Sequence, residues 1–195
     1  MKFRTLIAAL AAMLSLTGAA AEKGKAQAPA GTRVLIAFYS YSDNTRAAAK
    51  QIQAKIGGEL HDIKPEKPYP AQRKACVVQA KKEIRDGFTP KLSDTIDLAK
   101  YDIIFLGSPN WWGTIAPPVL AFIKTHDLSG KIIIPFFTHG GGGMQNCESD
   151  MKKYCDAAKA AKILPAATYP GSQTHKPLPE LVSWASASLD AARKK

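Results

Sequence analysis

Short apolar runs alternate with helical stretches along residues 33–192, and this alternation limits the possible folds more than any other feature of the chain. We expect strands at residues 33–39, 59–63, 102–106, 132–137 and 163–167. Helices are expected at residues 44–56, 71–85, 117–125, 145–161 and 178–192. Several strands are continuously apolar at their centres, as in a parallel sheet that helices cover on both faces. The sequence therefore predicts one α/β domain with short connections.

A polar loop, residues 40–46, separates the first expected strand from the first helix. Its sequence, Ser-Tyr-Ser-Asp-Asn-Thr-Arg, places hydroxyl and amide side chains at a strand-to-helix turn. Unpaired backbone N–H groups and the positive end of the helix dipole favour an anion at such a turn. Ser42, Asp43 and Asn44 are also preferred helix N-caps. Two interpretations stay open here: a phosphate-binding loop or a simple helix cap.

Two further unusual loops follow apolar runs. Residues 108–114 carry adjacent tryptophans on a polar loop, and at least one indole should offer a flat apolar face near the surface. Residues 138–144 contain four consecutive glycines, which favour close backbone approach or positive φ angles. A packed tryptophan and a plain flexible turn are the alternatives. In an open parallel sheet, loops at the carboxyl ends of strands converge on one crevice.

With these three loops, the chain resembles the flavodoxin-like family over residues 33–189, in particular its single-domain members with a Gly-Ser-Pro-Asn-Trp-Trp-Gly second loop. The resemblance implies an α/β fold with a doubly wound five-stranded parallel sheet of order 2-1-3-4-5. It also implies FMN at the strand ends, at the switch point between strands 1 and 3. In that family the first loop binds the FMN phosphate, the second covers the isoalloxazine ring, and the third lines the edge of the ring.

The resemblance assigns site residues by motif position. Those expected to hold the phosphate are Ser40, Ser42, Asn44 and Thr45, with Arg46 adding charge. Those expected to cover the ring are Pro109, Asn110, Trp111, Trp112 and Gly113. Those expected along its heteroatom edge are Thr138, His139, Gly140 and Gly141. For His139, a proton-donor role and an ordinary exposed loop histidine both remain possible, and no catalytic residue is assigned.

The implied function is electron transfer by an FMN-binding protein of the cell envelope, since the flavin carries the chemistry and the protein tunes it. The alternatives are an FMN-dependent NAD(P)H or quinone reductase, and a non-redox binding module with a disabled phosphate loop. Asp43 supports the last alternative, because flavodoxins usually carry glycine there and a carboxylate near a phosphate costs Coulomb energy. If Asp43 faces solvent or pairs with Arg46, that cost is about 1 kcal/mol or less.

The first residues predict export. Lys2 and Arg4 precede an apolar run over residues 6–16, and residues 17–21 offer a small-residue cleavage site. We expect a signal peptide over residues 1–21, cleaved near Ala21, and a flexible leader over residues 22–32. A retained membrane anchor is the lesser alternative, because a span needs about 20 apolar residues. The mature protein, with its domain at residues 33–192, would be periplasmic or secreted.

The chain is strongly basic, with a formal net charge of +11 at pH 7, of which the expected signal peptide holds only the two charges of Lys2 and Arg4. This charge favours an acidic redox protein or an anionic lipid surface as partner; a quinone is the other candidate. Nucleic acid is not expected, because the lysines are spread along helices without a recognition motif.

Three cysteines, Cys76, Cys147 and Cys155, would enter a compartment that permits disulfides. Cys147 and Cys155 fall in one expected helix, where a rise of 1.5 Å per residue separates their Cα atoms by about 12 Å, too far for a disulfide. A bridge would require residues 148–150 to form a loop. The histidines are scattered singly, so no metal site is expected.

Overall fold

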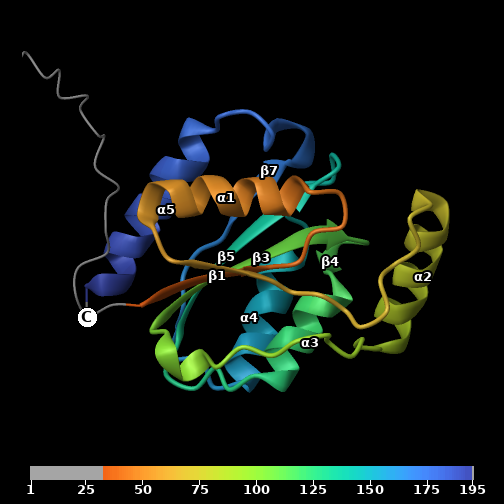
Figure 1. Ribbon diagram of the computed structural model, residues 1–195, viewed down its shortest axis with the longest axis horizontal. Coiled ribbons are helices and arrows are strands. Elements are labelled where there is room, and N and C mark those ends of the chain that lie inside the picture. The colour runs from red at the N-terminus through yellow and green to blue at the C-terminus, as the bar shows by residue number, and fades with distance from the viewer. Residues whose placement is uncertain (1–32, 195) are drawn as a thin grey trace, which may run out of the picture.

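The computed structural model describes residues 33–194. The expected signal peptide and leader lie outside these residues, so their boundaries remain predictions. Figure 1 shows a central sheet with helices on both sides. Among the described residues, no helix is long and apolar enough to cross a membrane.

The sheet and its helices follow one another along the chain in the predicted alternation. The strands are β1 (Val34–Phe38), β2 (Glu59–Asp62), β3 (Ile103–Trp111), β4 (Thr114–Ile115), β5 (Ile132–His139), β6 (Lys162–Ile163) and β7 (Ala167–Pro170). The α-helices are α1 (Asn44–Ile56), α2 (Arg73–Asp86), α3 (Pro117–Thr125), α4 (Cys147–Ala157) and α5 (Pro179–Arg193). Short 3₁₀ turns are η1 (Leu98–Lys100) and η2 (Gly171–Gln173).

The strand order is β2-β1-β3-β5-β6, and β7 pairs with β5 beyond β6. All of these pairings are parallel; β4 alone pairs antiparallel, with β3. Because β6 and β7 lie end to end along β5, they act as one interrupted fifth strand. The predicted doubly wound order 2-1-3-4-5 is therefore confirmed.

The interruption of the fifth strand corrects the single strand expected at residues 163–167. Pro165 lies between β6 and β7 and has no N–H to give to the ladder. Leu164 still donates its N–H to the Ile133 carbonyl at 2.9 Å. The N–H of Ala166 leaves the ladder and binds Glu148 Oε1 at 2.7 Å. A side chain from α4 thus replaces one hydrogen bond of the sheet.

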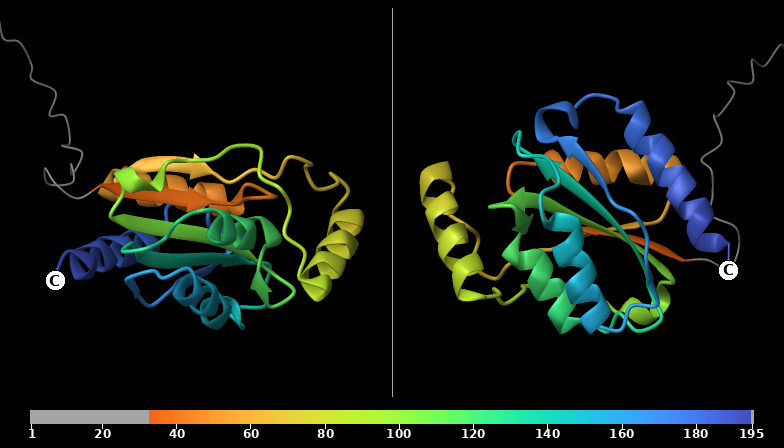
Figure 2. Two further views of the ribbon diagram at one scale, coloured as in Figure 1. Left: turned by 90° about the horizontal axis from the view of Figure 1, so that it is seen from below. Right: turned by 180° about the vertical axis from the view of Figure 1, so that it is seen from behind.

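Two apolar layers hold the helices against the sheet. Helices α1 and α5 cover one face of the sheet, and α3 and α4 cover the other (Figure 2). Ile36 and Phe105 pack with residues of α1 and α5, while Leu35 and Ile104 pack with residues of α3 and α4. Helix α2 stands apart at the rim of the molecule (Figures 1 and 2), and of its residues only Cys76 and Ala80 are buried. The carboxyl ends of β1, β3 and β5 are left beside this helix, which is where the candidate site lies.

Candidate functional site

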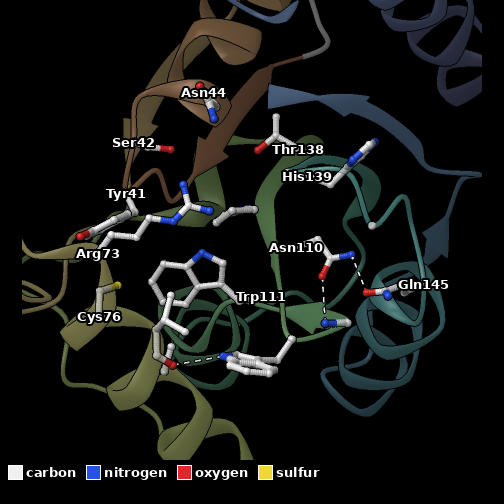
Figure 3. A pocket seen from close by; sticks show the side chains of 17 residues that line it. Tyr41, Ser42, Asn44, Arg73, Cys76, Asn110, Trp111, Thr138, His139 and Gln145 are labelled. Carbon is white, nitrogen blue, oxygen red and sulfur yellow. Dashed lines mark hydrogen bonds between the residues drawn. The ribbon is translucent and has the colours of Figure 1, made fainter. Parts of the chain in front are cut away.

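A pocket of about 610 Å³ lies at the carboxyl ends of β1, β3 and β5 (Figure 3). All three predicted loops contribute to it, and α2 forms a further wall. The predicted residues that line it are Ser42, Asn44, Pro109, Asn110, Trp111, Trp112, Gly113, Thr138, His139 and Gly140. No aspartate or glutamate is among its lining residues. The pocket therefore suits a ligand that is flat at one end and anionic at the other.

The remaining predicted residues, Ser40, Thr45, Arg46 and Gly141, lie outside the lining. Ser40 Oγ accepts the Arg46 N–H at 3.2 Å, which satisfies one donor in the first turn of α1. Arg46 itself turns to two carboxylates: its Nη2 lies 2.8 Å from Asp62 Oδ2 and its Nε 3.2 Å from Asp43 Oδ1. The positive charge of Arg46 is thus compensated by neighbouring side chains.

Asp43 ends the first loop in a left-handed conformation, with φ 59°. Glycine adopts this conformation at no steric cost, and aspartate is among the few other residues that tolerate it. The Asp43 side chain is 72% exposed and pairs with Arg46. The left-handed backbone explains why flavodoxins usually carry glycine at this position. Because the carboxylate is exposed and paired with Arg46, its repulsion of an anion in the pocket should be small.

The start of α1 leaves backbone donors free beside the pocket. Ala47 donates its N–H to the Asp43 carbonyl at 2.8 Å, as the first regular turn requires. The preceding N–H groups, of Asn44 and Thr45, have no hydrogen-bond partner among residues 33–194. Asn44 also lines the pocket with its side chain. The helix start thus offers an anion a set of donors.

The tryptophan segment is a β-hairpin and not the loop that the sequence predicted after residue 106. β3 continues to Trp111, and β4 pairs back on it through Trp111 and Thr114. The two turn residues, Trp112 and Gly113, have φ angles of 55° and 87°. Positive φ at both central residues is typical of the type I′ turn that favours tight hairpins. The hairpin therefore determines where the two adjacent tryptophans lie: Trp111 at the end of β3 and Trp112 in the turn.

The two tryptophans take different positions. Trp111 lines the pocket, and the rings of Tyr39, Tyr41 and Tyr69 meet it edge-to-face at centroid distances of 5.5, 6.0 and 4.9 Å. Trp112 is 54% exposed and donates its indole N–H to the Val77 carbonyl of α2 at 3.1 Å. Trp111 therefore forms the aromatic wall, while Trp112 connects the hairpin to α2 at the rim.

The glycine-rich loop is tied to the hairpin by Asn110. Its Nδ2 donates to the Gly143 carbonyl at 2.7 Å and to Gln145 Oε1 at 3.1 Å, and its Oδ1 accepts the Gly113 N–H at 2.9 Å. Gly141 and Gly143 have φ angles of 124° and 70°, so the loop does use conformations that favour glycine. Asn110 thus orders two walls of the pocket at once.

His139 has a defined orientation in this loop. Its Nδ1 lies 3.0 Å from the backbone N of Gly141 and accepts that N–H. The neutral ring therefore carries its hydrogen on Nε2. His139 can offer that N–H to a ligand in the pocket, which it lines.

Seven residues of the lining were not predicted as site residues from the sequence: Tyr41, Arg73, Cys76, Val77, Ala80, Gly142 and Gln145. Arg73 is the first residue of α2, and its side chain extends into the pocket above Trp111 (Figure 3). It is the only lysine or arginine in the lining, and it has no ion-pair partner in the described part of the chain. A lone arginine at a helix start carries no sequence signal that distinguishes it from the other basic residues of α2.

The cysteines are reduced and buried. Cys76, Cys147 and Cys155 are all free thiols, and Cys147 and Cys155 both lie in α4, so residues 148–150 form no loop. Burial raises the pKa of Cys147 to about 12 and that of Cys155 to about 12. Within residues 33–194, no group of histidine, cysteine, aspartate or glutamate could hold a metal ion.

Together, the fold and the pocket define a doubly wound α/β protein with a pocket at the topological switch point of its sheet. The chain belongs to the flavodoxin family, whose model matches residues 33–183. No curated protein matches the chain.

Solved structures agree with this assignment. A candidate flavoprotein from Bacteroides eggerthii is 25% identical, with a TM-score of 0.68, over 84% of this chain and 99% of that one. A flavoprotein from Lactobacillus acidophilus, solved in complex with FMN, is 26% identical, with a TM-score of 0.63, over 70% of this chain and 93% of that one. An archaeal flavodoxin, 13% identical over 84% of this chain and 98% of that one, has a TM-score of 0.53 and shares the fold.

Proposed function

We propose that this protein binds FMN in the pocket and transfers electrons in the cell envelope. One observation carries the proposal: a single pocket joins the donor-rich start of α1 to the aromatic wall of Trp111. Its volume, about 610 Å³, falls in the range of small-molecule sites. The FMN-bound structure of the Lactobacillus flavoprotein supports the choice of ligand.

The polar end of the pocket fits a phosphate. The free N–H groups of Asn44 and Thr45 and the side chains of Ser42 and Asn44 would donate to its oxygens. Arg73 would supply positive charge, because Arg46 is already paired with Asp43 and Asp62. No carboxylate in the lining opposes a dianion. The exposed position of Asp43 weakens the case for a non-redox module with a disabled loop.

The apolar end fits a flat ring. Trp111, held by three tyrosine edges, offers an indole that excludes water from one side of the pocket. When bound, FMN would supply one- and two-electron redox chemistry. The aromatic wall disfavours added negative charge in the pocket, whereas Arg73 favours it. The balance between these residues would set the reduction potential.

We further propose that the mature protein starts near Glu22 and works outside the cytoplasm, with an acidic redox protein or a quinone as its partner. The signal-peptide pattern of residues 1–21 and the basic charge of the remaining chain support this proposal. Cell fractionation, with mass spectrometry of the purified N-terminus, would test it. Full-length protein found only in the cytoplasm would contradict it.

An absorbance titration tests FMN binding directly. We expect the purified protein to bind FMN more tightly than riboflavin, because only FMN carries the phosphate. Ser42→Ala should weaken FMN binding, whereas Ser183→Ala, on the exposed surface of α5, should leave it unchanged. Equal affinity for the two flavins would contradict the phosphate site. Anaerobic reduction in single-electron steps would favour a carrier, whereas rapid reduction by NADH would favour the reductase alternative.

A further inference from the structure

We infer that His175, a residue outside all three pocket loops, is a positioning residue for the phosphate site because it fixes the amide orientation of Asn44. The inference rests on the proposed function, since it concerns the anionic end of the same pocket. His175 lies in the connection between η2 and α5, and its Nε2 is 2.8 Å from Asn44 Oδ1. The two residues are 131 positions apart in the chain.

The hydrogen bond decides which end of the amide faces the pocket. Asn44 Oδ1 can only accept, so His175 Nε2 must donate to it. With its oxygen engaged by His175, the amide directs its nitrogen toward Thr138 and the pocket (Figure 3). That nitrogen lies close to Gly171, and it donates to no acceptor among residues 33–194. Asn44 thus turns its amide nitrogen rather than its oxygen toward the place where an anion would bind, whereas the flipped amide would present an oxygen and repel it.

The segment that carries His175 is itself firmly held. Gln51 of α1 donates to the carbonyls of Thr174 and Lys176 at 2.7 and 3.0 Å. The buried Thr174 hydroxyl donates to the Gly171 carbonyl at 2.8 Å. These bonds hold the backbone on both sides of His175, which is itself exposed.

Gly171 completes the arrangement. A Cβ at this position would collide with the Asn44 amide, so the close approach of η2 to the start of α1 requires glycine. Asn44 therefore lies between Gly171 and His175, and the hydrogen bond from His175 favours one orientation of its amide. The mechanism needs neither a change of charge on His175 nor direct contact between His175 and the phosphate.

Flavin titrations of variants test this inference. In the full chain, His175→Ala should weaken FMN binding about tenfold, the effect of losing one well-oriented donor to a charged group. Riboflavin affinity should change less than about twofold, because riboflavin lacks the group that Asn44 faces. His175→Gln should restore most of the FMN affinity, since the glutamine amide can donate to Asn44 Oδ1. Gln173→Ala, an exposed change in the same segment, is the control and should match wild type.

A double-mutant cycle separates positioning from a general structural effect. If His175 acts through Asn44, then Asn44→Ala with His175→Ala should bind FMN no more weakly than Asn44→Ala alone. Additive losses, equal losses for FMN and riboflavin, or an unaffected His175→Ala would each overturn the inference while leaving FMN binding intact. Wild-type protein that binds no FMN would overturn the proposed function and, with it, this inference.

Discussion

The hydroxyl oxygens of Thr45 and Thr138 lie 2.8 Å apart and share a buried hydrogen bond, although 93 positions separate the two residues. Thr45 lies in the first turn of α1, and Thr138 near the end of β5. Both side chains are almost fully buried, at 1% and 2% exposure. The bond joins the first turn of α1 to the strand that precedes the glycine loop.

Replacing both of these threonines should lower the free energy of unfolding by less than the sum of the two single replacements. Thr45→Val leaves the Thr138 hydroxyl buried without its partner, so we expect the free energy of unfolding to fall by about 1–3 kcal/mol. Thr45→Val with Thr138→Val removes both polar groups and should lose less than the sum of the single variants. Urea unfolding of the wild type, Thr45→Val, Thr138→Val and the double variant measures these free energies. Strictly additive losses would show that the two hydroxyls do not depend on each other.

Asp43 should influence FMN binding only weakly. Asp43→Asn keeps a residue type that tolerates φ 59° and removes the carboxylate, so FMN affinity should rise by about threefold or less at low salt. The gain should shrink at 150 mM salt, because an exposed charge is screened. Asp43→Gly should behave similarly. A gain well above tenfold in a flavin titration would mean that the carboxylate faces the phosphate.

Much of this fold could be predicted from the sequence because its signals are local. α1 and α3 occupy the expected residues, since one begins after a capping loop and the other at Pro117. The hairpin was missed because Ser108, Pro109 and Asn110 are typical of loops. Pairing with β5 continues the strand through Ser108 and Pro109, and pairing with β4 continues it through Asn110.

The site was predictable only in part, for the same reason. The three loops carry recognisable residue types, but Arg73 reaches the pocket from an edge helix, and His175 contacts Asn44 of the lining from a distant turn. Such contacts depend on how α2 and η2 pack, and no local pattern encodes that packing. The same holds for Arg46, whose sequence position beside the loop gave no sign of its pairing with Asp62 of β2.

Arg73 should contribute more to FMN affinity than any other cation of α2. Arg73→Gln removes the only lysine or arginine in the pocket lining, so we expect FMN binding to weaken about tenfold at low salt. Riboflavin should lose less, because it lacks the phosphate charge. Lys74→Gln is the matched control, an exposed neighbour outside the lining. Equal effects of the two variants would indicate a diffuse field rather than a specific contact.

The buried thiols of α4 should make the fold sensitive to alkaline pH. Burial raises the pKa of Cys147 and of Cys155 to about 12, whereas an unfolded thiol ionises near pH 8.5. Below about pH 8.5 the thiols are neutral in both states, and their full contribution to stability is present. As the pH rises toward 12, only the unfolded state ionises, so that contribution is progressively lost.

Urea unfolding in the presence of a reductant, at pH 7.5, 9 and 10.5, measures this loss. We expect the free energy of unfolding to fall across the series and to fall less steeply in Cys155→Ala, because one of the titrating thiols is gone. That variant should be less stable than wild type at pH 7.5, since a buried side chain is shortened. The two effects are separable, because the cavity lowers the free energy of unfolding equally at every pH, whereas loss of the thiol changes how steeply that free energy falls with pH. An unchanged slope would mean that the Cys155 thiol ionises as readily in the folded protein as in the unfolded chain.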